Sequence, residues 1–498
     1  MSRWKLSRLC SGLLCALLIV AACAPPSTPA PTQAPAKPAD STAAKPAESK
    51  PAEAAKPAAP AAQPAATAAQ KPAEAAKPAD STAAKPAAGG APVKLSFIGV
   101  ESDDQKFALS AVLAEYQKTR PEVTVEFELL PFPQLFPKIQ ANAAAKAPTD
   151  IILTDGPNLW SFAYNGIIAP MDEWFDKALI EKSWTPTSLA TSSYRGKFYA
   201  PPQMESCSIM WFNKDMTDKA GIKPPDALAQ TWTMDQALDA WQKTNNPPQT
   251  YGIRWGQGNT PGQDYEAGLM RRAAGKKDSK AYKGIADDGL TISGYFDDPQ
   301  AVMGLTFFHE LYQKHKVSAV EGIPDAWVNQ KAAFFISPDN ALGTYKRLNA
   351  TFQYGVTGIP YFKDGAQICH TDSWHYGLGA NSANKKEAAE FIKFASGPVG
   401  SKIFYDRFGQ LPAHLDVLNT LPDYQQNPRK LLAEQFKAAG APRIQTVGFT
   451  EYNGLMIELV GNLVAGQNLD VQQLATALAK RADGLTAKYK DWQTKPMP

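Results

Sequence analysis

The hydrophobic residues that follow Pro92 switch between two periods along the chain. Compact apolar runs and one stretch of alternating apolar and polar residues indicate strands, and apolar residues three and four apart between them indicate helices. The elements expected are a strand at 93–100, a helix at 107–117, a strand at 123–129, a helix at 135–146 and a strand at 150–154. Strands alternating with helices at this spacing predict βαβ units, an α/β fold and a mostly parallel sheet.

Ligands of such a sheet bind at the carboxyl ends of its strands, which here are the loops that start at Glu101 and Asp155. The body from Val93 to Pro498 is too long for one hydrophobic core. We therefore expect two lobes.

The first residues have the pattern of an export signal. Three basic residues precede an apolar run from Leu9 to Ala22, which is short for a membrane span but has the length of a signal-peptide core. The run ends in VAAC, residues 20–23, which resembles a bacterial lipobox. This predicts a lipoprotein signal peptide at 1–22 and a lipidated Cys23 that anchors the chain to the outer face of the cell membrane. The alternative is an ordinary cleaved signal peptide.

Residues 23–92 consist almost wholly of Ala, Pro, Lys, Glu, Ser and Thr, and KPADSTAAKPA occurs twice, at 37–47 and 77–87. A segment without aromatic or large aliphatic side chains cannot bury enough apolar surface to offset its chain entropy. Frequent prolines stiffen it toward polyproline II, so that its reach is on the order of 200 Å at about 3.1 Å per residue. We expect a disordered tether.

Charge and motifs exclude several functions. The formal net charge is +3, three positive charges lie in the first 22 residues, and no basic cluster with interleaved aromatics occurs, so no nucleic-acid partner is expected. No G-x-S-x-G, H-E-x-x-H or Walker pattern is found, so no catalytic residue, metal or cofactor is expected. Cys207 and Cys369 are the cysteines of the folded body, and the sequence leaves their pairing open.

The folded body contains a series of short motifs whose order resembles that of a known protein family. The ordered stretches are PTDIIL at 148–153, WSFAYNGIIAPMDEW at 160–174, GKFYAPP at 196–202, MWFNKDM at 210–216, AGIKPP at 220–225, TWT at 231–233, NQKAAF at 329–334, YGVTGIP at 354–360, AEFIKF at 389–394 and GQLP at 409–412. Together they resemble the family 1 extracellular solute-binding proteins of ABC importers, the class that contains maltodextrin-binding proteins.

The resemblance implies a type II periplasmic-binding-protein-like fold, in which hinge strands join two α/β lobes. The lobes would be 93–203 plus 361–405 and 204–360 plus 406–498. It also implies a monomer that captures a small molecule, here a carbohydrate, between the lobes and delivers it to ABC permease subunits. The alternatives are a receptor for a peptide, polyamine or metal, a surface glycoside-active enzyme, and a structural protein of the cell surface.

Sugar pockets combine carboxylates and amides for hydroxyl groups with aromatic rings for the C–H faces. Asp103 follows the first strand, although it also suits a helix N-cap with Ser102. Asp155 follows the buried strand, and Trp160 comes five residues later. Trp160 could instead be a core residue on the helix that follows the strand. Maltodextrin-binding members of the family have an aromatic residue and a carboxylate in this loop. The corresponding residues here are Thr154 and Pro157, and this departure argues against maltodextrin as the solute.

The later candidates depend more strongly on the family. Glu205 follows the first expected hinge crossing, and Trp255 precedes a glycine-rich loop, so that both suit a pocket wall. Asn340 and Tyr452 are expected ligand contacts by resemblance alone.

The stretch ICHTDSWHYGLGAN, residues 368–381, contains residue types that commonly ligate metals, namely one cysteine, one aspartate and two histidines. We interpret it as one strand that returns to the N-terminal lobe. On such a strand His370 and His375 face opposite sides, which disfavours one shared ion, and Asp372 and Trp374 share a face. This predicts a pocket wall in which Asp372 and Trp374 contact the solute.

Overall fold

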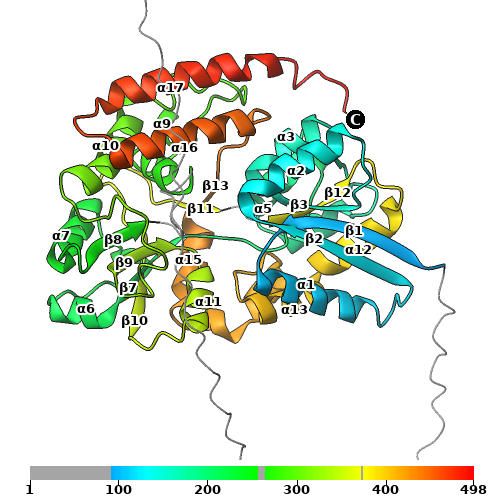
Figure 1. The fold of residues 1–498 in the computed structure, drawn as a ribbon, viewed down its shortest axis with the longest axis horizontal. Helices are drawn as coiled ribbons and strands as arrows, with labels where there is room; N and C mark the ends of the chain where they lie inside the picture. The colour runs from blue at the N-terminus through cyan, green and yellow to red at the C-terminus, as the bar shows by residue number, and fades with distance from the viewer. Residues whose placement is uncertain (1–90, 256–263, 372–373, 498) are drawn as a thin grey trace, which may run out of the picture. The chain divides into compact units, whose positions relative to one another are not determined.

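The structure is a computed structural model that describes residues 91–255, 264–371 and 374–497. The predicted signal peptide, Cys23 and nearly all of the tether lie outside these residues. The helices and strands of the described body are arranged around two separate sheets (Figure 1).

The first sheet has five strands in the order β2-β1-β3-β12-β4. The strand β1 is parallel to β2 and β3, whereas β12 is antiparallel to its neighbours β3 and β4. The carboxyl ends of β1, β2 and β3 therefore lie at one edge of the sheet, where β12 begins. The bounds are β1 Val93–Val100, β2 Val123–Leu130, β3 Ile151–Asp155, β4 Ile168–Ala169 and β12 Trp374–Gly379. The strand at the start of the body is confirmed at its predicted bounds.

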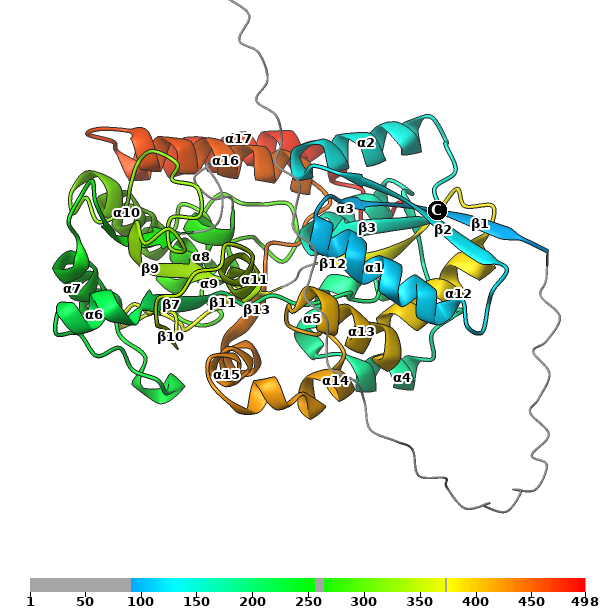
Figure 2. The ribbon, with the colours of Figure 1, turned by 60° about the horizontal axis from the view of Figure 1, so that its bottom comes forward.

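Helices cover both faces of this sheet (Figures 1 and 2). Apolar side chains of α1, α12 and α13 pack on one face, and those of α2 and α3 pack on the other. The first helix begins where Ser102 accepts a hydrogen bond from the backbone N–H of Gln105, as the N-cap interpretation expects. The bounds are α1 Asp103–Tyr116, α2 Phe132–Ala144, α3 Leu159–Tyr164, α4 Lys177–Ser183, α5 Pro186–Ser192, α12 Lys385–Ser396 and α13 Pro398–Phe408, with the short hairpin β5 Ser193–Tyr194 and β6 Lys197–Phe198.

The second sheet has four strands in the order β10-β7-β9-β8. Every residue of β7 and β9 is buried, because both strands are central in the sheet. A capped helix, α7, packs its buried face, which includes Trp241, against β8 and β9. The bounds are β7 Ile209–Asn213, β8 Tyr251–Trp255, β9 Ala332–Ser337, β10 Tyr354–Thr357, α6 Lys214–Lys219, α7 Met234–Thr244 and α11 Asn340–Arg347.

A layer of helices completes this part of the molecule. The helix α10 contacts α8, α16 and α17, and the last two also pack on each other. The bounds are α8 Leu269–Ala273, α9 Lys280–Lys283, α10 Pro299–Gln313, α14 Leu415–Thr420, α15 Arg429–Ala439, α16 Phe449–Ala465 and α17 Val471–Thr486. Among the residues that the structure describes, we find no helix with both the length and the hydropathy needed to cross a bilayer.

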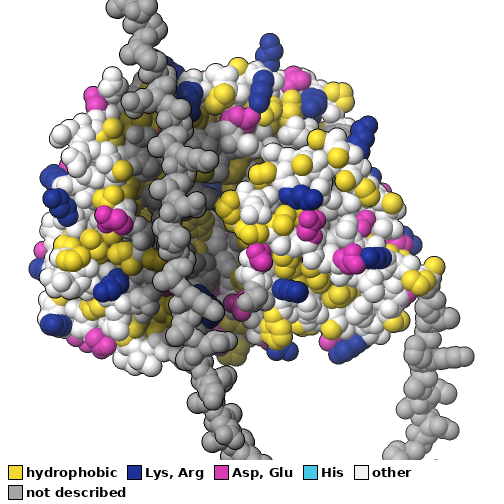
Figure 3. All heavy atoms as spheres, viewed as in Figure 1, with side chains coloured by type: hydrophobic (Ala, Val, Ile, Leu, Met, Phe, Trp, Pro, Cys, Tyr) yellow, Lys and Arg dark blue, Asp and Glu magenta, His cyan; other side chains and the backbone are white. Residues whose placement is uncertain are grey.

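The surface carries charges of both signs. On the face drawn in Figure 3, basic and acidic side chains of the described residues are interspersed, and neither kind gathers into a continuous patch. Such a face provides little attraction for a polyanion such as a nucleic acid.

Candidate functional site

A cavity of about 390 Å³ lies between α2, the end of β3 and the first half of α16. From α2 it is lined by Phe132, Pro133, Phe136, Pro137 and Gln140. From the other elements it is lined by Asp155, Asn158, Phe449, Thr450, Asn453 and Ile457. Its volume lies within the range of roughly 300–1,000 Å³ that is typical of small-molecule sites. The cavity is therefore the candidate binding site.

The cavity face of α2 follows from the helical period. Residues 132, 133, 136, 137 and 140 lie within one stripe, while Leu135 and Ile139 are buried on the other side of the helix, toward the sheet. Pro133 fits the first turn because the N–H that it lacks would have no acceptor within the helix there. Thus α2 has two apolar faces, of which one packs on the sheet and the other lines the cavity.

Asp155 lies at the carboxyl end of β3, at the edge of the sheet that strand topology favours for a ligand. Its carboxylate accepts a hydrogen bond from Arg443 at 2.5 Å, and both side chains are nearly fully buried. Burial raises the pKa of Asp155, and the Arg443 guanidinium opposes that rise. Asp155 can accept hydrogen bonds inside the cavity, and Arg443 keeps it in place.

Two strands bring a predicted pair together. Trp374 opens β12 and lies opposite Asp155 on β3 in the antiparallel register. The Trp374 ring stacks on Phe136, with centroids 6.4 Å apart and an interplanar angle of 12°, and it meets Phe132 edge-on at 6.1 Å. Trp374 therefore supports the aromatic wall of the cavity from behind, while Asp155 lines the cavity itself.

The helix α16 presents one stripe to the cavity and another to the core. Phe449, Thr450, Asn453 and Ile457 line the cavity. Tyr452 is 1% exposed, and its hydroxyl accepts a hydrogen bond from Arg271 at 3.3 Å. The predicted contact Tyr452 thus lies on the right helix but on the stripe that faces the interior.

Basic side chains gather behind Asp155. Arg443 lies over the ring of Tyr265, and Arg272 contacts Nε2 of His370 at 3.2 Å. Burial, together with the charges of Arg272, Arg443 and Arg271, lowers the pKa of His370 well below its usual value. His370 is therefore neutral at physiological pH, since protonation would add a positive charge to a buried positive cluster.

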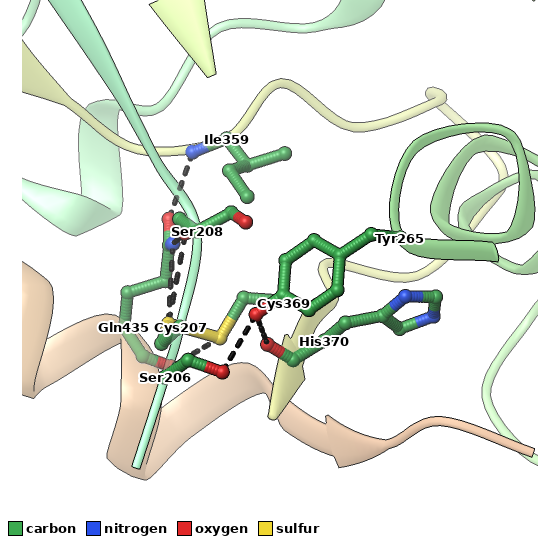
Figure 4. Close-up of a disulfide and its surroundings, with 8 residues drawn as sticks. All are labelled: Ser206, Cys207, Ser208, Tyr265, Ile359, Cys369, His370 and Gln435. Atoms are coloured by element: carbon green, nitrogen blue, oxygen red, sulfur yellow. Dashed lines mark hydrogen bonds between the residues drawn. A yellow bond between two sulfur atoms is a disulfide. The ribbon is translucent and has the colours of Figure 1, made fainter. Parts of the chain in front are cut away.

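A disulfide joins Cys207 to Cys369 next to this cluster (Figure 4). Cys207 lies in the segment that connects the first sheet to β7, and Cys369 opens β11, Cys369–Thr371, which pairs in parallel with β13, Gly440–Pro442. The question that the sequence left open is thereby answered. Both segments connect the two parts of the body, so the disulfide fixes one crossing against the other.

Gln435 of α15 adds a polar clamp beside the disulfide (Figure 4). Its side-chain oxygen accepts from the backbone N–H of Ile359 at 2.8 Å, and its side-chain N–H donates to the backbone carbonyl of Ser208. The hydroxyl of Tyr265 bonds to Ser206 at 2.7 Å and to the carbonyl of His370 at 3.1 Å. Side chains of two helical segments thus bind the backbone of both crossing segments.

Two predicted tryptophans lie away from the cavity. Trp160 packs against Trp492, with centroids 5.1 Å apart, and donates its indole N–H to the carbonyl of Ser193 at 2.9 Å. Trp255 on β8 is 2% exposed and meets Trp241 and Phe308 edge-on. Both rings form part of a hydrophobic core, so the structure does not bring them to Asp155.

The remaining candidates are scattered. Glu205 is fully buried in the segment before β7, where its backbone N–H donates to Leu411. Asp103 and Asn340 are the first residues of α1 and α11, and the placement of their side chains lies outside what the structure describes. Asp372 also lies outside the described residues. Their role as ligand contacts stays a prediction.

The single strand expected for 368–381 is wrong. The structure divides this stretch between β11, which pairs with β13, and β12, which belongs to the first sheet. His370 lies against Tyr265 and Arg272, whereas His375 contacts Thr191 at 3.2 Å. Because pairing partners change within the stretch, alternation along a single strand cannot decide which side chains share a face. The expected return to the first sheet is confirmed for β12.

Most of the residues that line the cavity were not expected from the sequence. Phe132, Phe136, Asn158, Phe449 and Asn453 line it and were not expected. A usable signal existed for α2, where apolar residues occur on two faces of one amphipathic pattern. The helix was expected to start at 135, and it starts three residues earlier, because Pro133 belongs to its first turn.

The comparisons with known proteins agree with the two-sheet architecture. Residues 100–402 match the profile of the family described as bacterial extracellular solute-binding protein, and the chain belongs to that family. A protein of Brucella abortus (strain 2308), named only as a binding protein, is 25% identical over 331 residues, which are 64% of this chain and 75% of that relative. The sn-glycerol-3-phosphate-binding periplasmic protein UgpB of Pectobacterium atrosepticum is 24% identical over 280 residues, 52% of this chain and 60% of that relative.

Solved structures share the fold. An ABC transporter solute-binding protein of Thermotoga lettingae bound with α-D-tagatose superposes with a TM-score of 0.67 at 20% identity, covering 79% of this chain and 100% of that one. The substrate-binding protein Lmo0181 of Listeria monocytogenes, in complex with cycloalternan, gives 0.66 at 18% identity, covering 80% and 98%. The chain is therefore a bacterial extracellular solute-binding protein with a two-lobed α/β fold.

Proposed function

We propose that the protein captures a carbohydrate in the cavity between α2, β3 and α16 and delivers it unchanged to an ABC permease. The observation that carries the proposal is the cavity itself, which combines aromatic rings with the side chains of Asp155 and Asn158 at the carboxyl end of β3 and of Asn453 on α16. Carboxylate and amide groups hydrogen-bond hydroxyl groups, and rings cover sugar C–H faces. The sugars named with the similar solved structures support the same solute class.

The test is a binding screen on residues 93–498 as a purified protein. Mono- and oligosaccharides are assayed by thermal shift and then by calorimetry, because a ligand that binds only the native state raises its melting temperature. We expect at least one sugar to bind and Asp155→Asn or Asn453→Ala to weaken it at least tenfold. Ile180→Val, far from the cavity, is the matched control. A screen in which sugars give no shift, while peptides or polyamines do, contradicts the proposal.

Sugar recovery separates a receptor from an enzyme. We expect mass spectrometry to return the bound sugar intact after prolonged incubation, since the proposal assigns no catalytic group. Appearance of a shorter or hydrolysed product would instead support a glycoside-active enzyme.

The tether and anchor form a second part of the proposal. We propose that Cys23 carries lipid and that residues 24–92 connect it to the solute-binding body. Expression in a bacterial host followed by membrane fractionation tests this. The native chain should partition with membranes and incorporate a labelled fatty acid, and Cys23→Ala should abolish the labelling. Labelling that persists in Cys23→Ala contradicts the anchor.

A phosphorylated polyol is a second candidate solute. Relatives named as sn-glycerol-3-phosphate-binding proteins favour it, and Arg443 adds a positive charge next to Asp155 of the cavity. The screen therefore includes sn-glycerol 3-phosphate beside glycerol. Binding of the phosphate ester without binding of neutral sugars would replace the carbohydrate proposal.

A further inference from the structure

The α2 wall of the cavity is so apolar that it restricts which chemical groups of a solute can lie against it. Phe132, Pro133, Phe136 and Pro137 form four of its five lining residues, and Gln140 at the far end is the fifth. The side chains of phenylalanine and proline carry no hydrogen-bond donor or acceptor. Of the described α2 side chains in the cavity, Gln140 alone offers hydrogen bonds, and it donates to Thr450 of α16 at 3.3 Å.

The polar groups of the cavity come from the other elements. Asp155 and Asn158 lie at the end of β3, and Thr450 and Asn453 lie on α16. On α16 itself Ile457, which is 52% exposed, continues the apolar lining one turn beyond Asn453. The cavity thus has a polar side, formed by the end of β3 with part of α16, and an apolar side, formed by α2 with Ile457.

This division disfavours a solute that directs hydroxyl groups at the apolar side of the cavity. A hydroxyl buried against phenylalanine and proline loses its hydrogen bonds to water without gaining others, which disfavours binding. A sugar ring can cover one aromatic face with its C–H groups, but the apolar side extends over more than one helical turn of α2, from 132 to 137, and adds Ile457. The part of the solute on this side has to be apolar.

The apolar side is also firmly held. Phe136 stacks on Trp374 and lies 6.3 Å from Phe162, and Phe132 meets both Phe136 and Trp374 edge-on. Rings that are fixed by other rings lose little entropy when a ligand arrives. The wall is therefore preorganised for an apolar group rather than shaped by one.

We propose that the solute is amphiphilic, a glycoside or sugar derivative whose hydroxylated part faces Asp155 and Asn158 and whose aryl or alkyl substituent lies against Phe132, Phe136 and Ile457. The inference rests on the proposed carbohydrate function and names the solute class of the same site.

Matched pairs of glycosides test the inference. Methyl and phenyl β-D-glucopyranoside, galactopyranoside and mannopyranoside are titrated calorimetrically into the purified full-length protein, with phenol as a probe without sugar. Burial of the added ring should tighten binding by about tenfold to hundredfold for the sugar that fits. We expect quenching or a shift of Trp374 fluorescence with the phenyl member, because that ring lies directly behind Phe136.

Two wall variants and one control show where the substituent binds. Ile457→Thr changes an exposed side chain and should leave folding intact while reducing the phenyl preference at least threefold. Phe132→Ser should reduce it further. Leu179→Thr, a substitution of another exposed apolar residue, on α4 outside the cavity, should leave the preference unchanged.

The outcomes separate the inference from the function on which it rests. Equal affinities of the methyl and phenyl members, or a preference that Ile457→Thr and Phe132→Ser leave intact, would overturn the amphiphilic solute and leave the carbohydrate function standing. Binding of phenol as tightly as the phenyl glycosides would overturn the carbohydrate function. If neither the methyl nor the phenyl glycosides nor any free sugar binds, both the amphiphilic solute and the carbohydrate function are overturned.

Discussion

Asp155 and Arg443 form a buried ion pair between the carboxyl end of β3 and the residue that follows β13, at 2.5 Å and 288 residues apart in sequence. A buried pair of this kind contributes little net stability compared with apolar residues of similar size, because both ions lose their hydration. Removing one partner is different, since it leaves an uncompensated charge inside the protein. The pair therefore fixes the position of Asp155 in the cavity more than it stabilises the fold.

Substitution of Arg443 by Met should lower the free energy of unfolding by about 3–5 kcal/mol, because Asp155 stays buried without its partner. The double variant Asp155→Asn/Arg443→Met should lose clearly less than the sum of the two single variants. Urea denaturation measures all four proteins. Lys94→Met is the control, because its ion pair with Glu126 is exposed and should be worth at most about 1 kcal/mol. Additive losses at Asp155 and Arg443 would contradict their coupling.

His370 should make the body less stable in mild acid. Its pKa is lowered in the folded state by burial and by Arg272, Arg443 and Arg271, so below the unfolded pKa of about 6.5 the unfolded chain binds a proton that the native state does not. The free energy of unfolding should then fall by up to about 1.4 kcal/mol per pH unit through this residue alone. Denaturation series from pH 7 to 5 compare the native chain with His370→Gln, in which this slope should be absent. His315→Gln, two residues beyond the end of α10, serves as the histidine control, and loss of the slope there instead would contradict the assignment.

Gln435→Ala should destabilise the hinge region. The substitution leaves the N–H of Ile359 and the carbonyl of Ser208 buried without their present partner, at about 1–3 kcal/mol for each group. Gln472→Ala is the matched control, because that side chain is exposed where it bonds to Asp297. Hydrogen exchange should show faster exchange at Ile359 in the Gln435 variant alone. Unchanged protection there would argue that Gln435 does not hold the crossing segment.

Two tryptophans should respond differently to truncation. Trp255→Ala removes a core ring and should cost about 3–5 kcal/mol, whereas Trp255→Phe should restore most of the stability and leave solute affinity unchanged. Trp374→Ala should cost less stability, because the ring is only half-buried, and should weaken solute binding by loosening Phe136. Calorimetry and thermal unfolding separate the two effects. If the Trp255→Phe protein were fully folded but bound the solute more weakly, Trp255 would have to contribute to the binding site.

The disulfide should account for a substantial part of the stability of the body. It closes a long loop, with a sequence separation of 162, and cross-links of this kind typically contribute about 2–4 kcal/mol. We expect Cys207→Ser/Cys369→Ser to lose an amount in that range under non-reducing conditions. Addition of a thiol reductant to the unfolding buffer should destabilise the native chain and leave the double variant unaffected. A reductant effect on the double variant would point to another origin.

The strands β1, β2 and β3 could be predicted from the sequence because their signals are local, whereas the antiparallel strands β12 and β4 make the first sheet less parallel than expected. Each strand from 93 to 155 is a compact apolar or alternating run bounded by polar residues, and the position of Asp155 at a carboxyl end follows directly from that pattern. Most of the cavity could not be predicted in this way. Phe449 and Asn453 reach it only because α16 packs near α2, more than 300 residues earlier in the chain, and nothing in the period of α16 shows which of its two stripes faces a solute.

Two further differences between the expected picture and the structure have local causes. The stretch 368–381 alternates like one strand, but β11 and β12 exchange partners within it, and a change of sheet leaves no mark on a period of two. Trp160 and Trp255 carry the residue type of a sugar site, yet large aromatic side chains serve cores as often as pockets. Composition alone could not separate the two uses.

The bond between Cys207 and Cys369 also determines how the molecule transmits mechanical force. A pull on its two ends passes across the two sulfur atoms and bypasses the chain between them, which includes the whole four-stranded sheet. A loop of that length would otherwise extend by roughly 500–600 Å at about 3.3–3.6 Å per residue. In the oxidised protein the disulfide prevents this extension. A single-molecule force–extension trace should therefore show the additional length only after the disulfide is reduced.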